Sequence, residues 1–323
     1  MRVLVTGGAG YIGSVVTARL LADGHEVVVV DDLSTGHADA VPPGAVFHEL
    51  PITALDPVLG DWNIEAAIHF AAKSLVGESA QNPALYWRNN VVGTIALLDS
   101  LRAFGVDRIV FSSSAATYGE SEVQPITEDV PPRPTSPYGA TKLAIDLALT
   151  DYAHAYRVGA VSLRYFNVAG ALHTASGHSY GERHATETHL IPNALRAAAG
   201  TGGVMKLFGA DYPTVDGTCV RDYIHVDDLA SAHLLALGAV TPGEHHVVNL
   251  GSGAGYSVRQ VLDAVGEVTG TRVPVEEAPR RAGDPAVLVA SNERAAALLG
   301  WAPTLGLADM IRDAWVFEQS RTA

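Results

Sequence analysis

The sequence predicts an α/β fold with a Rossmann-type, doubly wound parallel sheet, and three observations support it. Short β-rich segments alternate with helical patterns over the first half of the chain, an order typical of parallel sheets with helices on both faces. The segment GGAGYIG joins the first β-rich segment to the first helical pattern, as in a phosphate-binding turn. The length of 323 residues exceeds the usual single-core size, so we expect a second, smaller lobe.

The first strand, predicted over residues 2–6, leads into a glycine turn and a helical segment that ends at Gly24. Missing side chains at Gly7, Gly10 and Gly13 permit a tight turn, close approach of a pyrophosphate and close packing of the helix on the strand. The first amides and the dipole of the helix then favour phosphate binding. No GK[ST] follows the turn, so the pattern indicates a dinucleotide rather than the ligand of a P-loop.

The second strand, predicted over residues 26–30, ends in Asp31, eighteen residues after Gly13. A carboxylate at this place would accept hydrogen bonds from a ribose diol. Asp31 and Asp32 would repel a 2′-phosphate, and no arginine lies among the next few residues to offset them. The sequence therefore predicts NAD rather than NADP.

Further strands are predicted over residues 45–50, 66–70, 108–112 and 160–163, between helical patterns. The two longest helices, over 84–104 and 138–156, carry apolar residues on more than one face. A helix with more than one apolar face needs a second surface to pack against. We therefore expect a homodimer that buries the additional faces; the alternative is that they are buried inside the monomer.

Beyond Asn167 the chain becomes rich in Gly, His and Ser, and the segments VRDYIHVDDLA and HVVNLGS then resemble strands that return to the main sheet. The second lobe is therefore expected to be discontinuous. We predict an NAD-binding domain of residues 1–167 plus about 216–250, and a substrate domain of about 168–215 plus 251–323.

Composition excludes several classes of function. A formal charge of −14 argues against nucleic-acid binding, which depends on Lys and Arg. The apolar segments are far shorter than the ~20 residues of a membrane span. The single Cys219 cannot form an intramolecular disulfide, and the chain opens on a strand, so a cytoplasmic location is expected. His184 and His189 lack the helical spacing and carboxylate of zinc enzymes, so no metal is predicted.

Three residues together predict a hydride-transfer site. Tyr138 and Lys142 stand one helical turn apart in SPYGATK, and Ser114 ends the predicted strand RIVFSSS. A neighbouring ammonium and a cationic nicotinamide would favour the Tyr138 phenolate, the proposed base. Ser114 would hydrogen-bond the substrate hydroxyl, and Lys142 would also hold the nicotinamide ribose. Such a Tyr–Lys pair is often a surface contact, but the glycine turn favours the catalytic interpretation.

Longer motifs then identify a family: IHFAAKSLVGES, FSSSAATYGE, LRYFNVAG, ETHLIPN and YPTVDGTCVRDYIHVDDLA. Over nearly its whole length the chain resembles the UDP-glucose 4-epimerases of the extended short-chain dehydrogenase/reductase family. The resemblance implies a tightly held NAD that is reduced and reoxidised in each cycle. Tyr138 would take the proton of the sugar 4-hydroxyl, and the resulting 4-keto sugar would turn about its diphosphate link before it is reduced on the opposite face.

The turn, the strand ends and the resemblance together give two sets of binding residues. The NAD set is Gly7, Gly10, Tyr11, Ile12, Gly13, Asp31, Asp32, Ser34, Thr35, Gly36, Ile52, Phe70, Ala71, Ala72, Ser74, Asn89, Ser112, Tyr138, Lys142, Tyr165 and Phe166. The set for the UDP-sugar is Ser114, Tyr138, Asn167, His189, Leu190, Phe208, Arg221, Arg281, Asp284 and Leu288.

The chain departs from the family pattern at several places. Pro51 stands where many members have an adenine-binding aspartate, so adenine would be held near Ile52 and NAD retention would be weaker. Ser74, rather than Lys73, is expected to face the cofactor. His189 replaces an asparagine and is either a substrate contact or a structural histidine. Leu288 leaves room beside the sugar C2, which predicts activity on UDP-N-acetylhexosamines as well.

The sequence disfavours three other functions. A 4,6-dehydratase of this fold needs an acidic pair where the chain has Ala115 and Ala116. A decarboxylase of UDP-uronic acids needs additional cations, for which no clear candidate exists. A redox-sensing binding protein would usually lack Tyr138 and Lys142. A 4-epimerase that prefers an N-acetylhexosamine or a pentose stays open.

Overall fold

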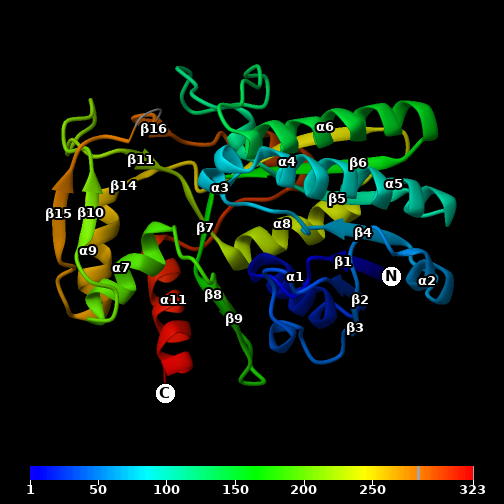
Figure 1. The fold of residues 1–323 in the computed structure, drawn as a ribbon, viewed down its shortest axis with the longest axis horizontal. Coiled ribbons are helices and arrows are strands. Elements are labelled where there is room, and N and C mark those ends of the chain that lie inside the picture. Colours follow the sequence, from blue (N-terminus) through cyan, green and yellow to red (C-terminus); the bar gives the residue numbers. More distant parts are fainter. Residues whose placement is uncertain (282–283, 323) are drawn as a thin grey trace.

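A computed structural model describes residues 1–281 and 284–322. Its larger lobe is built on a seven-stranded sheet of order β13-β6-β5-β4-β1-β2-β3, in which every neighbouring pair is parallel (Figure 1). The strands are β1 (Arg2–Thr6), β2 (Glu26–Asp31), β3 (Val46–Glu49), β4 (Ala66–His69), β5 (Arg108–Ser114), β6 (Gly159–Tyr165) and β13 (His245–Leu250). The strand order reverses between β1 and β4, which opens a crevice at their carboxyl ends. The predicted fold class is confirmed.

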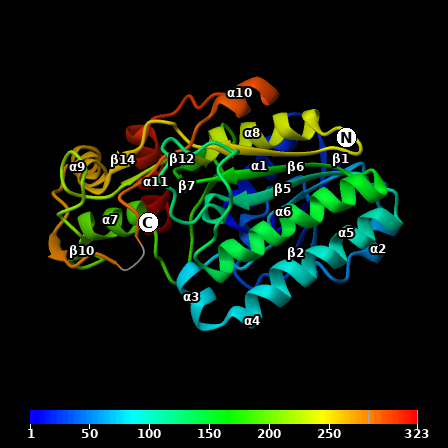
Figure 2. The ribbon, with the colours of Figure 1, turned by 90° about the horizontal axis from the view of Figure 1, so that it is seen from above.

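Helices cover both faces of this sheet (Figure 2). Strand residues Val3 and Val5 pack on one face, whereas Leu4 packs on the other, because successive side chains alternate. Both faces are buried, which explains the unbroken valine run of β2. The first face is covered by α1 (Tyr11–Ala22), α8 (Val226–Ala239) and α10 (Glu293–Leu299), and the second by α2 (Asp56–Asp61), α5 (Gly93–Ala103) and α6 (Pro137–Tyr156).

The predicted helix over 84–104 consists of three consecutive parts. They are α4 (Pro83–Tyr86), the wider π-helical turn η2 (Trp87–Val92) and α5, and α3 (Val76–Gln81) precedes them. Helix α6 has a strong start, because the Ser136 side chain accepts the Gly139 N–H at 3.1 Å and Pro137 fills the first position. Short 3₁₀ turns, η1 (Ala38–Ala40) and η3 (Ala115–Thr117), follow β2 and β5.

The smaller lobe lies beside the carboxyl ends of the strands (Figure 1). Its core includes Ile191, Val261 and Met310, which belong to α7 (Leu190–Ala198), α9 (Val258–Thr269) and α11 (Leu307–Thr322). Small sheets complete the lobe, formed by β10 (Met205–Phe208) with β15 (Val275–Ala278), and by β14 (Tyr256–Ser257), β11 (Val220–Arg221) and β16 (Val287–Leu288). The hairpin of β8 (Ala171–His173) and β9 (Ser179–Gly181) extends along α1.

One strand prediction is confirmed and one is wrong. The segment HVVNLGS joins the main sheet as part of β13 beside β6, whereas VRDYIHV does not return to it. Instead β11 joins the three-stranded sheet, and β12 (Tyr223–His225) pairs with β7 (Asn167–Ala169). Asp222, buried between β11 and β12, accepts the N–H groups of Ser252 at 2.6 Å, Gly253 at 3.0 Å and Ala290 at 2.9 Å. These loop amides hold the segment away from the sheet. The domain boundaries stay a prediction.

In the described parts of the chain, no helix is both long and apolar enough to cross a bilayer.

Candidate active site

A cleft of about 1460 Å³ runs from the glycine turn to the smaller lobe. All of the residues that the sequence analysis assigned to catalysis, to NAD or to the UDP-sugar line this cleft. They come from the glycine turn and the start of α1, from the ends of β2 to β6 or the loops that follow them, from η2 and α6, and from strands, loops and α7 of the smaller lobe. The structure thus brings these residues together at one cleft. The role of each residue stays a prediction.

The glycine turn has the geometry that a dinucleotide requires. Gly7 has φ +77°, and a Cβ there would lie 2.5 Å from the Ala71 nitrogen. A Cβ on Gly13 would lie 2.2 Å from the Gly7 carbonyl oxygen, so only glycine allows α1 to pack this closely. Gly10 precedes α1 and offers no side-chain cap. The first amides of α1 are therefore available to the phosphates of NAD.

Asp31 lies buried at the end of β2. Its Oδ2 accepts the Ala9 N–H at 3.1 Å and its Oδ1 accepts the Leu33 N–H at 2.9 Å. Burial raises the pKa of Asp31, and the two amide hydrogen bonds oppose the rise. The carboxylate is therefore fixed on the cleft wall by backbone groups. It fits the ribose of NAD and would repel the 2′-phosphate of NADP.

The loop after β4 differs in part from expectation. Ser74 is exposed and lines the cleft, as predicted, but Lys73 lines it too. The Lys73 ammonium donates to Ser34 Oγ at 3.1 Å, across the cofactor part of the cleft. Asn90 fixes the Lys73 backbone with two hydrogen bonds, of 2.8 and 3.0 Å. Lys73 therefore lines the cleft as Ser74 does, and Asn90 in NNVVGT is the residue that holds it there.

The catalytic wall, which we define as Ser112, Ser114, Tyr138, Lys142 and Tyr165, stands on β5, α6 and β6. The Lys142 ammonium donates to the Ser112 carbonyl at 2.5 Å and lies 5.9 Å from the centre of the Tyr138 ring. Burial lowers the pKa of Lys142 to about 8, and the Asp146 carboxylate opposes the fall. The Ser112 hydroxyl forms a short hydrogen bond with the Tyr165 hydroxyl.

Tyr138 is the candidate base, and its surroundings correct one expectation. Burial raises the pKa of Tyr138, and a hydrogen bond from Ser114 only partly opposes the rise. The chain's own groups therefore favour the neutral phenol, and a phenolate at Tyr138 would need a further positive charge, such as that of a cationic nicotinamide. Ser114 Oγ accepts the Ala116 N–H at 3.1 Å, which leaves its O–H free to donate to Tyr138 or to substrate.

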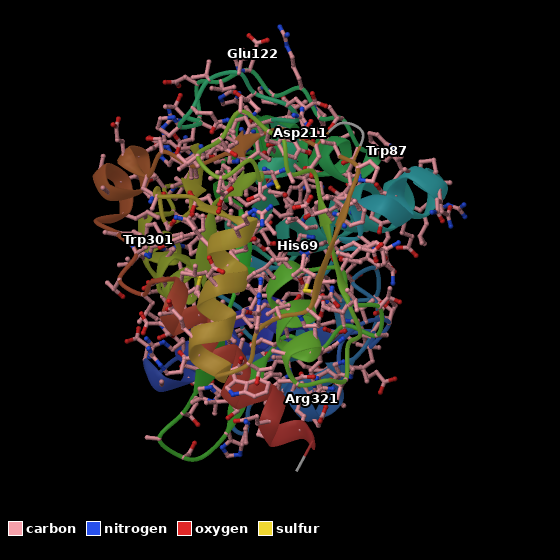
Figure 3. The ribbon with its side chains drawn as sticks, turned by 90° about the vertical axis from the view of Figure 1, so that its left-hand side faces the viewer. His69, Trp87, Glu122, Asp211, Trp301 and Arg321 are labelled. Atoms are coloured by element: carbon pink, nitrogen blue, oxygen red, sulfur yellow. The ribbon has the colours of Figure 1, made fainter. Side chains whose placement is uncertain are left out.

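Buried polar pairs support the catalytic wall from behind. Asp146 Oδ2 accepts Nε and Nη2 of Arg164 at 3.0 and 2.9 Å and the Ser113 hydroxyl at 3.1 Å. His69 bridges Thr6 at 2.6 Å and Thr94 at 2.8 Å in the interior (Figure 3). Burial and the Lys142 charge lower the pKa of His69 to about 3, so it stays neutral there.

The substrate wall, which we define as Phe208, Arg221, Arg281, Asp284 and Leu288, belongs to the smaller lobe. Arg221 forms a short ion pair with Asp284 and donates to the Val220 carbonyl at 2.8 Å. The Arg281 guanidinium lies 4.0 Å above the centre of the Phe208 ring. Leu288 is the register partner of Arg221 in the β11–β16 pair. Asn167 donates to the Asp222 carbonyl at 2.9 Å.

His189 belongs to a set of charged residues that the sequence analysis did not assemble. Its Nδ1 forms a short hydrogen bond with Glu182, and His184 Nδ1 lies 3.0 Å from the same Glu182 oxygen. The neighbouring carboxylates of Glu182 and Glu187 raise the pKa of His184 to about 10. The sequence analysis considered only helical spacing, whereas Glu182 and Glu187 approach these histidines in space.

Comparisons with known proteins show the family of the chain. The model of the NAD dependent epimerase/dehydratase family matches residues 3–251. A UDP-glucose 4-epimerase of Corynebacterium glutamicum is 54% identical over 98% of this chain and 95% of that protein. One of Streptomyces lividans is 51% identical over 98% of this chain and 96% of that protein.

Among solved structures, the UDP-glucose 4-epimerase from Brucella ovis in complex with NAD has a TM-score of 0.93 and 46% identity over 98% of each chain. Sequence and structure thus agree, and the chain belongs to the NAD dependent epimerase/dehydratase family, with UDP-glucose 4-epimerases as relatives over nearly its whole length.

Proposed function

We propose that the protein interconverts UDP-galactose and UDP-glucose by transient oxidation at the sugar C4. The observation that carries this proposal is the arrangement of Ser114, Tyr138 and Lys142 on one wall of a cleft that is also lined by the glycine turn and by Arg221 and Arg281. The names of the relatives support the choice of substrate.

When bound, NAD supplies the hydride acceptor and donor for the sugar C4. Tyr138 Oη takes the proton of the 4-hydroxyl and later returns it to the 4-oxygen. Ser114 donates a hydrogen bond to the same oxygen and stabilises charge as it develops. Lys142, held by the Ser112 carbonyl, supplies a fixed positive charge beside Tyr138 while it is protonated.

Inversion of the configuration at the sugar C4 requires that the protein bind the nucleotide tightly and the hexose weakly. Arg221 and Arg281 suit the diphosphate, because a guanidinium binds phosphate oxygens in bidentate fashion. Leu190 and Leu288 offer the hexose apolar contacts without hydrogen bonds from their side chains. The sugar can therefore turn its opposite face to the cofactor while the diphosphate stays in place.

The test is chromatography of nucleotide sugars after incubation of the purified protein with UDP-galactose and no added NAD. We expect UDP-glucose to form, and the Tyr138→Phe variant to form none. Formation only with added NAD would show that Pro51 has weakened cofactor retention. Absence of product under both conditions would refute the proposed substrate.

A wider substrate range is the second candidate, and Leu288 on the cleft wall favours it. Tyrosine at this place would fill the space beside the sugar C2, whereas leucine leaves room for an N-acetyl group. We expect Leu288→Tyr to lower the relative rate on UDP-N-acetylglucosamine, measured against UDP-glucose. Unchanged relative rates would contradict this assignment. A 4,6-dehydratase is disfavoured by Ala115 and Ala116 on the cleft wall.

The homodimer is also a proposal. Large apolar side chains are exposed on η2 and α6, namely Trp87 by 43%, Val92 by 61%, Leu147 by 59% and Tyr156 by 53%. Trp87 lies at the edge of the molecule (Figure 3), and α5 and α6 form an outer layer (Figure 2). Sedimentation velocity should give a dimer that Leu147→Asp disrupts. A cytoplasmic location stays a proposal, supported by the single free cysteine.

A further inference from the structure

Four side chains with metal-binding atoms meet on residues 182–189, the segment between β9 and α7, which we call the strap. Glu182, His184, Glu187 and His189 each offer one donor atom, and the four atoms lie within 4.8 Å of one another. Within residues 1–281 and 284–322, no other group of His, Cys, Asp and Glu gathers in this way. We call these four residues the His–Glu cluster.

The distances approach those of a tetrahedral site. Ligands bound to zinc at about 2.1 Å lie about 3.4 Å apart at tetrahedral angles. His184 Nδ1 lies 3.0 Å from Glu182 Oε1 and 3.7 Å from Glu187 Oε1, and the contact between His189 and Glu182 is closer still. Side-chain rotations that close the widest separation, up to 4.8 Å, by about 1.4 Å and open the contact between His189 and Glu182 would place all four donors around one ion.

An unsatisfied carboxylate oxygen gives independent evidence for a ligand. The Glu187 side chain is 2% exposed, and its Oε1 accepts the N–H groups of Thr188 and His189 at 2.8 and 2.9 Å. Its Oε2 is buried and has no hydrogen-bond partner. His184 Nδ1, although close to Glu182, is also without a well-directed hydrogen bond. A buried carboxylate oxygen without a partner is costly, and a cation would satisfy it.

We propose that the His–Glu cluster binds one zinc ion. Two imidazole nitrogens and two carboxylate oxygens suit Zn²⁺, whereas Mg²⁺ and Ca²⁺ prefer oxygen ligands alone. Four protein ligands fill a tetrahedral shell, so the ion has a structural role. It holds the strap where it crosses to the NAD-binding lobe.

Contacts of the strap show what the ion would secure. His37 Nε2 lies 3.0 Å from the Arg183 carbonyl, and Arg183 forms an ion pair with Asp39. Tyr11, the first residue of α1, lines the same cleft as His184 and His189, so the cluster and the glycine turn face one cleft. Zinc would therefore fix one wall of the cofactor part of the cleft.

The experiment measures zinc bound to the intact holoprotein. Protein dialysed against zinc and then against zinc-free buffer is analysed for metal content, and the affinity is obtained by competition with a chromophoric chelator. The test variants are His184→Gln and His189→Asn. The control is His246→Gln, which removes another histidine in contact with a glutamate, Glu244, at 2.9 Å. Circular dichroism verifies that each variant is folded.

We expect one zinc per chain in the native protein and in His246→Gln. Each test variant should bind zinc more than about 100-fold more weakly, since loss of an outer partner alone costs 10- to 100-fold. Equal affinity in the test variants and the control, or no zinc retained by the native protein, would overturn the proposal and leave an ion-pair cluster.

A second measurement stays informative if a test variant folds poorly. Trypsin cleaves after Arg183, inside the strap, and bound zinc should slow this cleavage at least about tenfold in the native protein, because cleavage requires local opening. The same rate with zinc and with a chelator would contradict zinc binding by the strap.

Discussion

The catalytic wall and the substrate wall face the same cleft but are built differently. Lys142 is 2% exposed and rests on regular elements, β5 and α6, behind which Asp146 and Arg164 form a buried pair. Arg221 and Arg281 stand on a two-residue strand and a loop, and Arg281 is exposed. Proton transfer requires atoms fixed within fractions of an ångström. A diphosphate is instead held by charge, which tolerates a more open wall.

The largest effect should follow from removal of the proton-transfer group. Tyr138→Phe should lower kcat by about 10²- to 10⁴-fold, the usual contribution of a general acid–base group. Tyr152→Phe is the matched control on the same helix, because its hydroxyl donates only to Asp99, at 2.8 Å. Steady-state kinetics with UDP-galactose measures both. Similar kcat losses in the two variants would contradict the special role of Tyr138.

A buried charge behind the catalytic wall should matter for stability. Asp146→Asn leaves Arg164 without its buried carboxylate and should lower the free energy of unfolding by about 3–5 kcal/mol. The control is Asp129→Asn, because Asp129 pairs with Arg294 and is 85% exposed. This variant should lower the free energy of unfolding by less than about 1 kcal/mol. Urea unfolding measures both. Equal losses would mean that burial does not distinguish the two pairs.

The pH dependence of stability provides a third test. The pKa of Lys142 falls from 10.5 to about 8 in the folded protein, so the folded state binds fewer protons between these values. The penalty for the buried charge is complete below pH 8 and disappears as pH rises toward 10.5. At its full size, this penalty lowers the free energy of unfolding by about 3 kcal/mol.

Relative to Lys142→Met at equal NAD loading, the native protein should therefore gain stability from pH 8 to 10. Urea unfolding at several pH values measures this gain. If the difference in free energy of unfolding between the two proteins did not change with pH, Lys142 would keep an ordinary pKa.

On the substrate wall, a change of geometry at constant charge should raise KM. Arg221→Lys loses bidentate contact with the diphosphate and should raise KM about 10- to 100-fold, as for a lost hydrogen bond to a charged group. Its kcat should change less. Arg280→Lys is the control, because Arg280 pairs with the exposed Asp211. A loss in kcat with unchanged KM would place Arg221 on the catalytic side of the comparison.

The smallest effect concerns the stacking that orients Arg281. Phe208→Leu removes the ring 4.0 Å below the guanidinium and should raise KM two- to fivefold, since an exposed cation–π contact contributes about 0.5–1 kcal/mol. Tyr212→Leu removes a similar stack, of Arg280 at 4.3 Å, from a pair outside the cleft lining. It should leave KM unchanged; an equal rise would show that the effect is not specific to the cleft.

The sequence predicted the parts of the site that depend on local spacing. The glycine turn, Asp31 and the Tyr138–Lys142 pair follow from fixed distances along a strand or helix, and the structure brings them together as expected. Residues that meet only through tertiary packing were missed or uncertain. Lys73 reaches Ser34 across the cleft, and Glu182 meets His189 where the chain folds back before α7. No period along the chain encodes such contacts.

The buried carboxylate of Asp222 bears on the modularity of the molecule. It receives amides from Ser252, Gly253 and Ala290, whereas the family match ends at residue 251. A chain cut at that boundary would leave the carboxylate without these donors, directly beside Arg221. The matched segment is therefore not a self-sufficient unit. The C-terminal 72 residues must be exchanged together with it in any chimera of two such enzymes.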